Sequence, residues 1–295
     1  MKNILNKLSD KKILITGSNG YIGNKIKIAL NKNQINPKCS TGDLSFKETW
    51  KENLDKETDI IFHLAAAEGK DKDISMNSKS VLSLLETCVE MNIKPIIIYA
   101  SSTNVFGLTN KRVINEKVGS LPLSEYSAHK ILGENYLKQF YRKYHIPSII
   151  LRIPNIYGPS SMKKNFNKSI INRVVANSIK KKNLKLFDNR NCLRDFLYID
   201  DAVSAFLISS LLDKKSFDAS FYILSSQEKT TIQDAWKVIQ NKTNNKNLTI
   251  DDKNLLSPME YRNFTADSSK FRELTNWKSK ISLNKGIEST INFLK

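Results

Sequence analysis

A tyrosine and a lysine four residues apart could carry acid–base chemistry in this chain. Tyr126 and Lys130 enclose the stretch Tyr-Ser-Ala-His-Lys, and on a helix this spacing puts both side chains on one face. A phenol ordinarily loses its proton at about pH 10, but an ammonium group beside it stabilises the phenolate and lowers that pKa. The pair could therefore take a proton from a hydroxyl group at neutral pH, although the same spacing also occurs in solvent-facing helix pairs.

A hydroxyl group at the end of an expected strand could act with this pair. The apolar run 95–100 leads into two serines, and Ser102 is followed by Thr103 and Asn104. A serine at the carboxyl end of a parallel strand can hydrogen-bond a reacting oxygen and share the path of the proton. The order of these motifs favours a catalytic interpretation of Tyr126.

A glycine-rich turn indicates a second kind of chemistry. Gly17, Gly20 and Gly23 follow an apolar run at residues 12–16 and open an expected helix at residues 21–31. The first two glycines permit a tight turn and the close approach of a pyrophosphate, and the third lets the helix pack on the strand. The helix N-terminus offers N–H groups and a partial positive charge to phosphates. The turn predicts a dinucleotide site, so hydride transfer to a nicotinamide is the chemistry that the tyrosine would accompany.

Apolar runs and helical periodicities alternate along the first half of the chain. Strands are expected at residues 12–16, 59–64, 95–100 and 147–153, and helices at 21–31, 78–91 and 125–144. This alternation predicts an α/β fold with a Rossmann-type, doubly wound parallel sheet covered on both faces.

The second half of the chain has a different pattern. It predicts helices at 165–182, 231–242 and 283–294, the middle one capped by Thr230 or Thr231, and short strands near 184–187 and 221–224. Asp200 and Asp201 are expected to cap a helix that begins at Ala202. We expect residues 1–160 to form mainly a dinucleotide-binding domain and residues 161–295 mainly a smaller α+β substrate lobe, with 195–215 returning to the first domain.

Composition limits the class of protein. The 295 residues contain 40% hydrophobic side chains but no apolar run of about eighteen residues, so no membrane span is expected. Three cysteines, Cys39, Cys88 and Cys192, are too few and too scattered for a disulfide frame or a metal site, which fits a reducing cytoplasm. The net charge of +18 comes from dispersed lysines, so we interpret it as composition and expect no specific nucleic-acid partner.

Further motifs extend the pattern along the chain. In order they are 16–23, His-Leu-Ala-Ala at 63–66, Asn77, 101–107, 126–130, Arg-Ile-Pro-Asn-Ile-Tyr-Gly-Pro at 152–159 and Arg-Asp-Phe-Leu-Tyr-Ile-Asp-Asp at 194–201. Together they resemble the NAD-dependent epimerase/dehydratase family, the extended branch of the short-chain dehydrogenases, from Lys12 to about Leu294. The resemblance implies a cytoplasmic enzyme similar to UDP-glucose 4-epimerases, with a nucleotide-sugar substrate and a role in polysaccharide biosynthesis.

The resemblance implies a role for single residues. Tyr126 would be the catalytic base, Lys130 its partner and Ser102 the third member, because Ser102 stands five residues before Gly107. The implied cofactor is NAD, with NADP left open, and the residues expected to contact it are Gly17, Asn19, Gly20, Tyr21, Ile22, Gly23, Asp43, Leu44, Leu64, Ala65, Ala66, Asn77, Tyr126, Lys130 and Ile153. The residues expected to contact the sugar nucleotide are Thr103, Asn104, Asn155 and, through the diphosphate, Arg194.

Departures from the family pattern bear on cofactor and substrate. The acidic residue that normally binds the adenosine ribose should end the second strand, but residues 34–40 contain no acid and do contain Lys38. The second phosphate-binding arginine of the family is missing from residues 257–260, although Arg262 is close. The expectation for two other residues is structural: Arg152 bonding backbone carbonyls, and His63 packed in the core. A homodimer through the helices at 78–91 and 125–144 is implied by the resemblance alone.

One position separates the reactions of the family. Sugar 4,6-dehydratases of this family carry an Asp-Glu pair after the catalytic threonine, whereas this chain has Thr103 and Asn104, which supply no carboxyl group. A 4-epimerase that transiently oxidises the sugar C4 fits the residues present, and a 4-keto-sugar reductase that consumes NAD(P)H is the alternative. A non-enzymatic nucleotide- or RNA-binding relative is a third hypothesis, and the retained Tyr126 and Lys130 argue against it.

Overall fold

The protein is described by a computed structural model, which covers residues 2–67, 73–160, 166–253 and 256–295. The chain divides into two compact units. The first contains Met1–Val105, Ser124–Arg152 and Val203–Tyr222, and the second contains Phe106–Leu123, Ile153–Ala202 and Ile223–Lys295. The assignment of one unit to the dinucleotide and the other to the substrate stays a prediction.

A six-stranded sheet forms the centre of the first unit. Its strands in spatial order are β11 (Asp218–Ile223), β6 (Ser148–Ile153), β4 (Ile96–Ser102), β3 (Ile60–His63), β1 (Ile13–Thr16) and β2 (Lys38–Cys39). β1 is parallel to both β2 and β3, and β3 is parallel to β4. The chain therefore leaves β1 toward β2 on one side and continues with β3 on the other. In open α/β sheets, ligands bind beyond the carboxyl ends of the strands at such a reversal.

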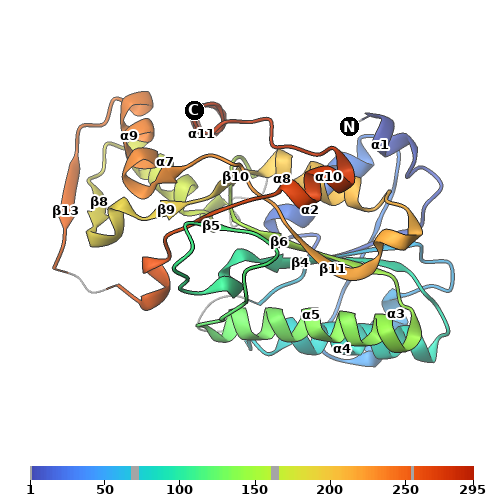
Figure 1. Cartoon of the computed structure of the whole chain (residues 1–295). Helices are drawn as coiled ribbons and strands as arrows, with labels where there is room; N and C mark the ends of the chain where they lie inside the picture. Colours follow the sequence, from blue (N-terminus) through green and yellow to red (C-terminus); the bar gives the residue numbers. More distant parts are fainter. Residues whose placement is uncertain (1, 68–72, 161–165, 254–255) are drawn as a thin grey trace. The chain divides into compact units, whose positions relative to one another are not determined.

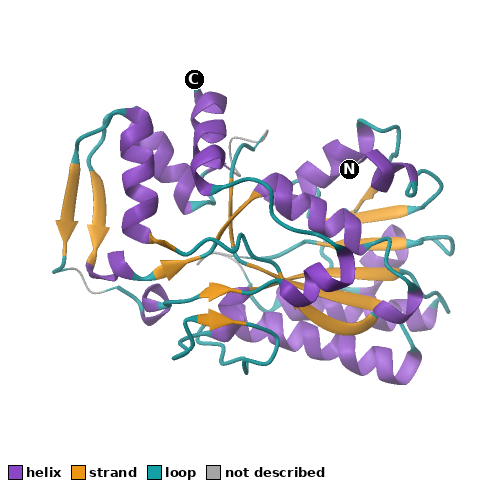
Figure 2. Cartoon of the chain, turned by 45° about the horizontal axis from the view of Figure 1, so that its top comes forward, coloured by secondary structure: helices purple, strands orange, loops and turns teal. Residues whose placement is uncertain are grey.

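Helices cover both faces of this sheet (Figures 1 and 2). α3 (Lys47–Asn53), α4 (Met76–Glu90) and α5 (Glu125–Tyr144) lie on one face, and α2 (Tyr21–Asn31) lies on the other (Figure 1). The short α1 (Lys2–Asn6) precedes β1, and α8 (Ile199–Ser209) enters the first unit from the second. The apolar core between the sheet and α3–α5 includes Trp50, Leu84, Tyr99, Leu137 and Ile150. The predicted Rossmann-type parallel sheet is thereby confirmed.

The second unit is built from short strand pairs and helices. β7 (Asn155–Tyr157) pairs with β10 (Phe196–Tyr198), β8 (Leu184–Phe187) with β13 (Leu248–Asp251), β9 (Leu193–Arg194) with β12 (Thr230–Thr231), and β5 (Val113–Ile114) with β14 (Thr265–Ala266). α7 (Ile170–Ile179), α9 (Ile232–Thr243) and α11 (Leu283–Leu294) pack on one another, and α10 (Ser269–Thr275) precedes α11. Short 3-10 helices cover Thr103–Phe106, Asp188–Asn191, Lys214–Ser216 and Pro258–Tyr261.

Local sequence signals explain where several helices begin. Ser124 caps α5 by accepting a hydrogen bond from the backbone of Ser127, and Thr231 forms a reciprocal capping box with Asp234 at the start of α9. The predicted bounds of the helices at 21–31, 125–144 and 283–294 are confirmed. The helix predicted at 165–182 is regular only over Ile170–Ile179 within the described residues.

The prediction for the start of the next helix was wrong. α8 begins at Ile199 rather than at Ala202, so Asp200 and Asp201 lie in its first turn instead of before it. The carboxylate of Asp201 accepts hydrogen bonds from the backbone N–H groups of Lys280 and Ile281. It therefore binds a distant loop rather than capping its own helix.

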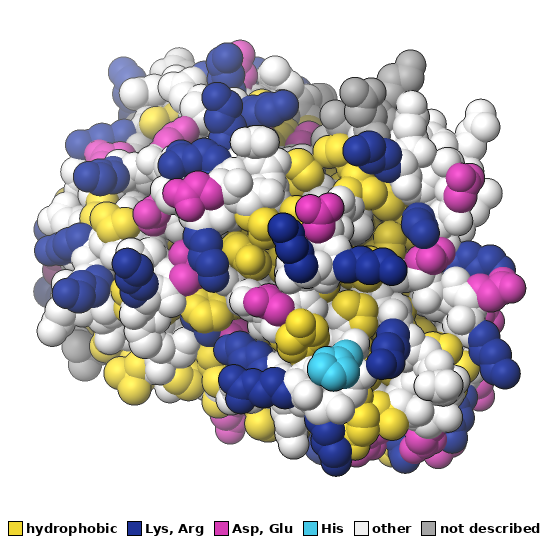
Figure 3. Space-filling view, turned by 45° about the vertical axis from the view of Figure 1, so that its right-hand side comes forward, with side chains coloured by type: hydrophobic (Ala, Val, Ile, Leu, Met, Phe, Trp, Pro, Cys, Tyr) yellow, Lys and Arg dark blue, Asp and Glu magenta, His cyan; other side chains and the backbone are white. Residues whose placement is uncertain are grey.

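The surface and the cysteines agree with the composition. No helix in the described part of the chain is long and apolar enough to cross a membrane. On the face drawn in Figure 3, lysine and arginine side chains are dispersed and interleaved with acidic ones rather than gathered in one patch. Cys39, Cys88 and Cys192 are all free thiols.

Candidate active site

The glycine turn links β1 to α2 in a conformation that only small residues permit. Gly17 has φ +65°, and a Cβ atom added to it would lie 2.8 Å from the backbone nitrogen of Ala65. A Cβ atom on Gly23 would lie 2.3 Å from the carbonyl oxygen of Gly17. Gly20 is the N-cap of α2, and no side chain caps the helix or places an acid in its first turn. The turn thus leaves the helix N-terminus open to an anion, as a dinucleotide pyrophosphate requires.

The end of β3 lies directly against this turn. Thr16 accepts hydrogen bonds at its Oγ1 atom from the backbone N–H groups of Leu64 and Ala65, each at 3.0 Å. Ala65 is half-buried and Ala66 is exposed. The structure therefore brings together two groups of residues that the sequence predicted to line the cofactor, the glycine turn and the segment that follows β3.

His63 completes the connection between these segments. The hydroxyl of Thr16 already accepts two N–H groups, so its own proton goes to His63 Nδ1 at 3.0 Å. His63 Nε2 then carries the ring proton and faces Ser80 Oγ at 3.3 Å. Complete burial, with a smaller contribution from the charge of Lys130, lowers the pKa of His63 to about 3. His63 is a neutral core histidine, as the sequence indicated.

Asn77 has a structural task in this unit. It is buried, its Oδ1 atom accepts the N–H of Ala67 at 2.9 Å, and its Nδ2 atom donates to the carbonyl of Ala67 at 2.8 Å. The amide side chain thereby fixes the backbone just after Ala66. A contact of Asn77 with the nicotinamide side stays a prediction.

The segment after β2 shows how the expected ribose site is built. Asp43 is exposed and accepts the backbone N–H of Ser45, and the carbonyl of the buried Leu44 accepts the indole N–H of Trp50. Lys38 donates to the carboxylate of Asp55 and to a backbone carbonyl, so its charge is partly compensated. Neither observation separates NAD from NADP.

Lys130 is the most constrained member of the predicted catalytic set. It is only 2% exposed, and its ammonium group donates to the carbonyl of Ala100 at 2.8 Å. The ammonium lies 4.8 Å from the ring centroid of Tyr99 and 5.8 Å from that of Tyr126. Tyr126 is half-buried near the start of α5. The four-residue spacing does place the lysine and the tyrosine together on one face of the helix, as predicted from sequence.

Ser102 ends β4 at the predicted position. Its Oγ atom accepts the backbone N–H of Asn104 at 3.1 Å, so the hydroxyl proton can be donated to another acceptor. Thr103 is buried and begins a 3-10 helix together with Asn104. A hydroxyl and an amide, but no carboxyl group, thus follow Ser102 in the chain.

A buried ion pair beneath this cluster was missed by the sequence reasoning. Arg152 was expected to bond backbone carbonyls; the structure shows it donating from Nε and Nη2 to the carboxylate of Glu134 at 2.9 and 2.7 Å. Ser101 also donates to this carboxylate, at 2.5 Å. The signal was present, because Glu134 follows Lys130 by four residues and therefore continues the helix face that Tyr126 begins.

In the second unit, Arg194 lies buried in β9. Its guanidinium donates to the carbonyl oxygens of Leu193 and Glu260, at 2.9 and 2.6 Å, and also to that of Arg262. Burial lowers the pKa of Arg194, and burial together with the neighbouring charge of Arg194 lowers the pKa of Arg262 to about 10. Two neighbouring guanidinium groups, that of the buried Arg194 and that of the half-buried Arg262, create a site of positive charge. Arg262 thus lies near Arg194, and its role as the second phosphate-binding arginine stays a prediction.

Two further predicted residues lie where β6 ends and β7 begins. Asn155 begins this strand, and both its backbone N–H and its side-chain amide donate to the carbonyl of Asp195 at 3.2 Å. Ile153 is half-buried at the end of β6. Both residues belong to the second unit, and their contacts with a ligand stay predictions.

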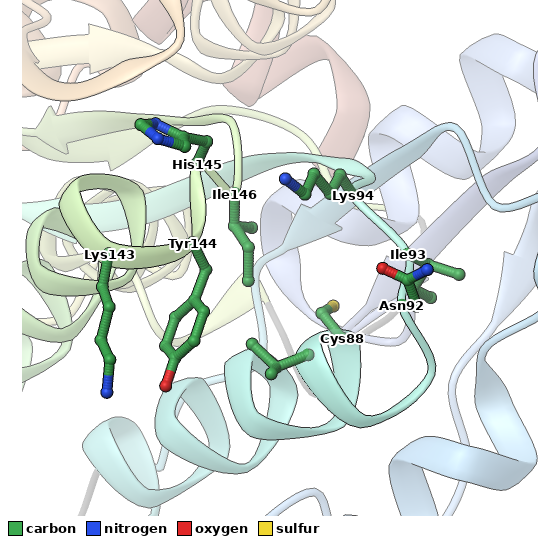
Figure 4. Close-up of a pocket in the computed structure, with 9 residues that line it drawn as sticks. Cys88, Asn92, Ile93, Lys94, Lys143, Tyr144, His145 and Ile146 are labelled. Carbon is green, nitrogen blue, oxygen red and sulfur yellow. The ribbon is translucent and has the colours of Figure 1, made fainter.

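A pocket of about 300 Å³ lies elsewhere in the first unit (Figure 4). It is lined by residues from the C-terminal ends of α4 and α5, including Cys88, Tyr144 and His145. Eighteen helical residues at 1.5 Å each put Tyr144 roughly 27 Å from Tyr126 along α5. Burial raises the pKa of Cys88 to about 12, so the thiol stays protonated. This pocket is separate from the predicted catalytic residues.

Known proteins share both the sequence and the fold. The chain is 27% identical to a putative UDP-glucose 4-epimerase of Methanocaldococcus jannaschii over 96% of this chain and 98% of that protein. It is 31% identical to a dTDP-D-glucose 4,6-dehydratase of Dictyostelium discoideum over 78% of this chain and 62% of that protein. The fold matches a crystal structure of a UDP-glucose 4-epimerase from Thermotoga maritima with a TM-score of 0.85, at 21% identity and over 96% of this chain and 98% of that one.

The Rossmann-type sheet, the open glycine turn and the tyrosine–lysine pair define a class, the nicotinamide-dependent enzymes that transfer hydride. A model of the NAD dependent epimerase/dehydratase family matches residues 13–216, and the chain belongs to this family. Its members are enzymes, so the protein is an NAD-dependent enzyme of the sugar-nucleotide epimerase and dehydratase kind.

Proposed function

We propose that this protein is a sugar-nucleotide 4-epimerase that transiently oxidises the C4 hydroxyl group of the sugar, with Tyr126 as base. The observation that carries the proposal is the composition of the cluster around Lys130. Lys130 holds its ammonium near the phenol of Tyr126, and Ser102 ends β4 two residues after the carbonyl that binds the ammonium, but residues 103 and 104 add no carboxyl group. Such a set can move one proton and orient one oxygen, which is what oxidation at C4 requires.

The glycine turn fits the pyrophosphate of a dinucleotide. Side chains at Gly17 or Gly23 would collide with the backbone of the turn and of the segment after β3, and the N-terminus of α2 carries no competing side-chain cap. Asn19, Tyr21 and Ile22 belong to the same turn and the first residues of the helix. The dinucleotide, when bound, supplies a ring that accepts hydride and later returns it.

In the proposed reaction, each side chain of the cluster has a separate task. The phenolate of Tyr126 takes the proton of the C4 hydroxyl as hydride leaves the same carbon, so the sugar becomes a 4-keto sugar. Ser102 donates a hydrogen bond to the C4 oxygen, and Lys130 stabilises the phenolate through its charge. After the keto sugar presents its other face, hydride returns to C4 and Tyr126 gives the proton back to the oxygen.

Residues of the second unit would bind the nucleotide part of the substrate. Arg194 and Arg262 bring two guanidinium groups together, and guanidinium groups suit the charge and geometry of a diphosphate. Asn155 would contact the sugar nucleotide from the start of β7. The epimerase names of the relatives in M. jannaschii and T. maritima support a UDP-sugar as the substrate.

The absence of a carboxyl group at residue 104 argues against a sugar 4,6-dehydratase. Dehydration needs an acid to protonate the leaving hydroxyl at C6 and a base for the proton at C5, and the Asn104 amide can do neither. One relative, in D. discoideum, is named a dTDP-D-glucose 4,6-dehydratase, and we infer that this chain does not carry out that reaction.

The test is the interconversion of UDP-hexoses by purified protein without added cofactor. An epimerase retains its dinucleotide, so mass spectrometry of the released ligands should find NAD and the assay should show two hexoses at equilibrium. Tyr126→Phe should lower turnover by roughly 10²–10⁴-fold, the usual size of lost acid–base catalysis, while dinucleotide binding changes less than about threefold. Turnover close to normal in that variant would show that the base is another residue.

A second candidate is a 4-keto-sugar reductase that consumes NAD(P)H. The observation that favours it is the segment after β2, which carries no acid before the exposed Asp43 and so offers a weak hold on the ribose of NAD. Steady, stoichiometric oxidation of NADPH with a 4-keto sugar would support the reductase, whereas epimerisation without net oxidation would rule it out.

A further inference from the structure

Tyr99 is a buried phenol that the proposed reaction does not use. It lies on β4 with no exposed surface, and within the described ranges no group hydrogen-bonds its Oη atom. One of its neighbours is the ring of His63, with centroids 5.8 Å apart and planes at 19°, and another is the ammonium of Lys130 at 4.8 Å from the centroid. A buried hydroxyl without a partner costs free energy, so any favourable contribution of this residue must come from its ring.

The helix opposite has a glycine where this phenol lies. A Cβ atom added to Gly133 would approach Tyr99 Oη to 2.8 Å and its Cζ atom to 3.2 Å. Gly133 is three residues from Lys130, in the middle of α5, where glycine costs roughly 1 kcal/mol relative to alanine. The helix therefore carries an unfavourable residue where any side chain would collide with the hydroxyl end of Tyr99.

Two neighbouring residues of β4 hold the Lys130 ammonium. The carbonyl of Ala100 accepts its hydrogen bond at 2.8 Å, and the face of Tyr99 lies beneath it. An ammonium group loses its hydration when it is buried, and an aromatic face replaces part of that stabilisation most effectively when the site is desolvated. Without the ring, the ammonium would move or take up water, and its charge would act less strongly on Tyr126.

We propose that Tyr99 is a positioning residue whose aromatic face holds the Lys130 ammonium beside Tyr126. This role rests on the proposed function only in so far as Tyr126 is the base that Lys130 assists. Tyr99 acts through Lys130, and the ring rather than the hydroxyl is the part that matters.

The surroundings explain why Tyr99 itself does not ionise. Burial, and then the neighbouring Tyr126 and Glu134, raise the pKa of Tyr99 well above its ordinary value. Of the two phenols near Lys130, Tyr126 is the half-buried one and is the one that the proposed function uses as a base. The titratable and charged groups around Lys130 are His63 on β3, Tyr99 on β4, Tyr126 and Glu134 on α5, and Arg152 on β6, which is paired with Glu134.

The test measures the ionisation of Tyr126 directly and needs no substrate. Tyrosinate absorbance is titrated with pH in the full-length protein and in Tyr126→Phe, and the difference between the two curves isolates Tyr126. The same pair of curves is recorded in Tyr99→Leu, Tyr99→Met and Tyr99→Phe backgrounds. We expect the midpoint for Tyr126 to rise by roughly half a pH unit to one pH unit with leucine or methionine, and to stay unchanged with phenylalanine.

Phe206→Leu is the matched control, because Phe206 is an equally buried ring of the first unit that does not contact Lys130. It should lower the melting temperature without moving the midpoint. Unchanged midpoints in both Tyr99→Leu and Tyr99→Met would overturn the proposal, and so would an equal rise in Phe206→Leu or in Tyr99→Phe. Methionine fills more of the space than leucine does, so it gives the answer if Tyr99→Leu fails to fold. Absence of epimerase activity would count against the proposed function and would leave this titration unaffected.

Discussion

Each unit of the molecule buries an arginine, and the two are stabilised in different ways. Arg152 in the first unit is 2% exposed, makes a two-pronged contact with the carboxylate of Glu134, and stacks 3.7 Å from the ring centroid of Phe221. Arg194 in the second unit is 7% exposed, and its guanidinium donates to backbone carbonyl oxygens. Within the described residues no carboxylate lies at ion-pair distance from Arg194.

The difference lies in whether a carboxylate compensates the charge of the guanidinium group. A carboxylate cancels the charge of Arg152, so the pair can lie in the core, where it ties α5 to β4 and β6. Carbonyl dipoles orient Arg194 but leave its net charge in place, and burial, followed by the charge of Arg194, lowers the pKa of Arg262. An anion at this position would remove the repulsion between the two guanidinium groups, which is the condition for a diphosphate site.

The largest expected effect comes from breaking the buried ion pair between Arg152 and Glu134. Glu134→Gln keeps the size of the side chain but leaves the buried charge of Arg152 uncompensated, so the free energy of unfolding should fall by about 3–5 kcal/mol. Urea unfolding followed by circular dichroism measures this loss. The double variant Glu134→Leu/Arg152→Met removes both charges and should be more stable than Glu134→Gln. If the single variant is as stable as the wild type, the pair does not carry the stabilisation assigned to it.

This pair also shows what sequence reasoning can and cannot reach. The parallel sheet, the long helix α5 and its tyrosine–lysine pair were predictable, because apolar runs and i, i+4 spacing are local signals. The partner of Arg152 was not identified, because Glu134 and Arg152 lie 18 positions apart in the chain and meet only when α5 packs on the sheet. The start of α8 was missed for a similar reason, since Asp201 bonds a loop about 80 residues away.

A smaller effect is expected from the arginine that retains its charge. Arg194→Gln should weaken the binding of UDP by roughly 10–100-fold, because a hydrogen bond to a charged group contributes about 1.5–3 kcal/mol. Isothermal titration calorimetry with UDP measures the dissociation constant. The slope of affinity against salt concentration should also become less steep, since one cation fewer faces the diphosphate.

Arg190→Gln is the matched control for this measurement. Arg190 belongs to the same unit, in the 3-10 helix before β9, but its guanidinium is paired with the carboxylate of Asp252. Its loss should change UDP affinity less than about twofold, since an exposed ion pair of this kind contributes little. Equal weakening by both substitutions would mean that general positive charge, rather than the Arg194 site, attracts the nucleotide.

The candidate site was only partly predictable for reasons that these residues make clear. Motifs with fixed spacing identify Gly17, Ser102 and Tyr126 in the sequence. Arg262 has no such spacing, and its place beside Arg194 depends on how the 258–262 turn folds back on β9. In the sequence, Tyr99 resembles the other apolar residues of its strand. The position of the Lys130 ammonium over its ring is what indicates the positioning role.

The smallest expected effect concerns His63, a buried base that stays neutral in the folded protein. His63 has its pKa lowered from its ordinary value of 6.5 to about 3, so between these values the unfolded chain binds a proton that the folded chain excludes. Folded-state stability should therefore fall as pH falls, by about 2 kcal/mol between about pH 6.5 and pH 5 from this residue alone. Urea unfolding of the wild type and of His63→Gln at several pH values measures it, because the difference between the two curves should shrink toward acid pH. Parallel curves for the wild type and His63→Gln would show that His63 takes up a proton in the folded protein as it does in the unfolded chain. His63 would then not be a neutral buried base.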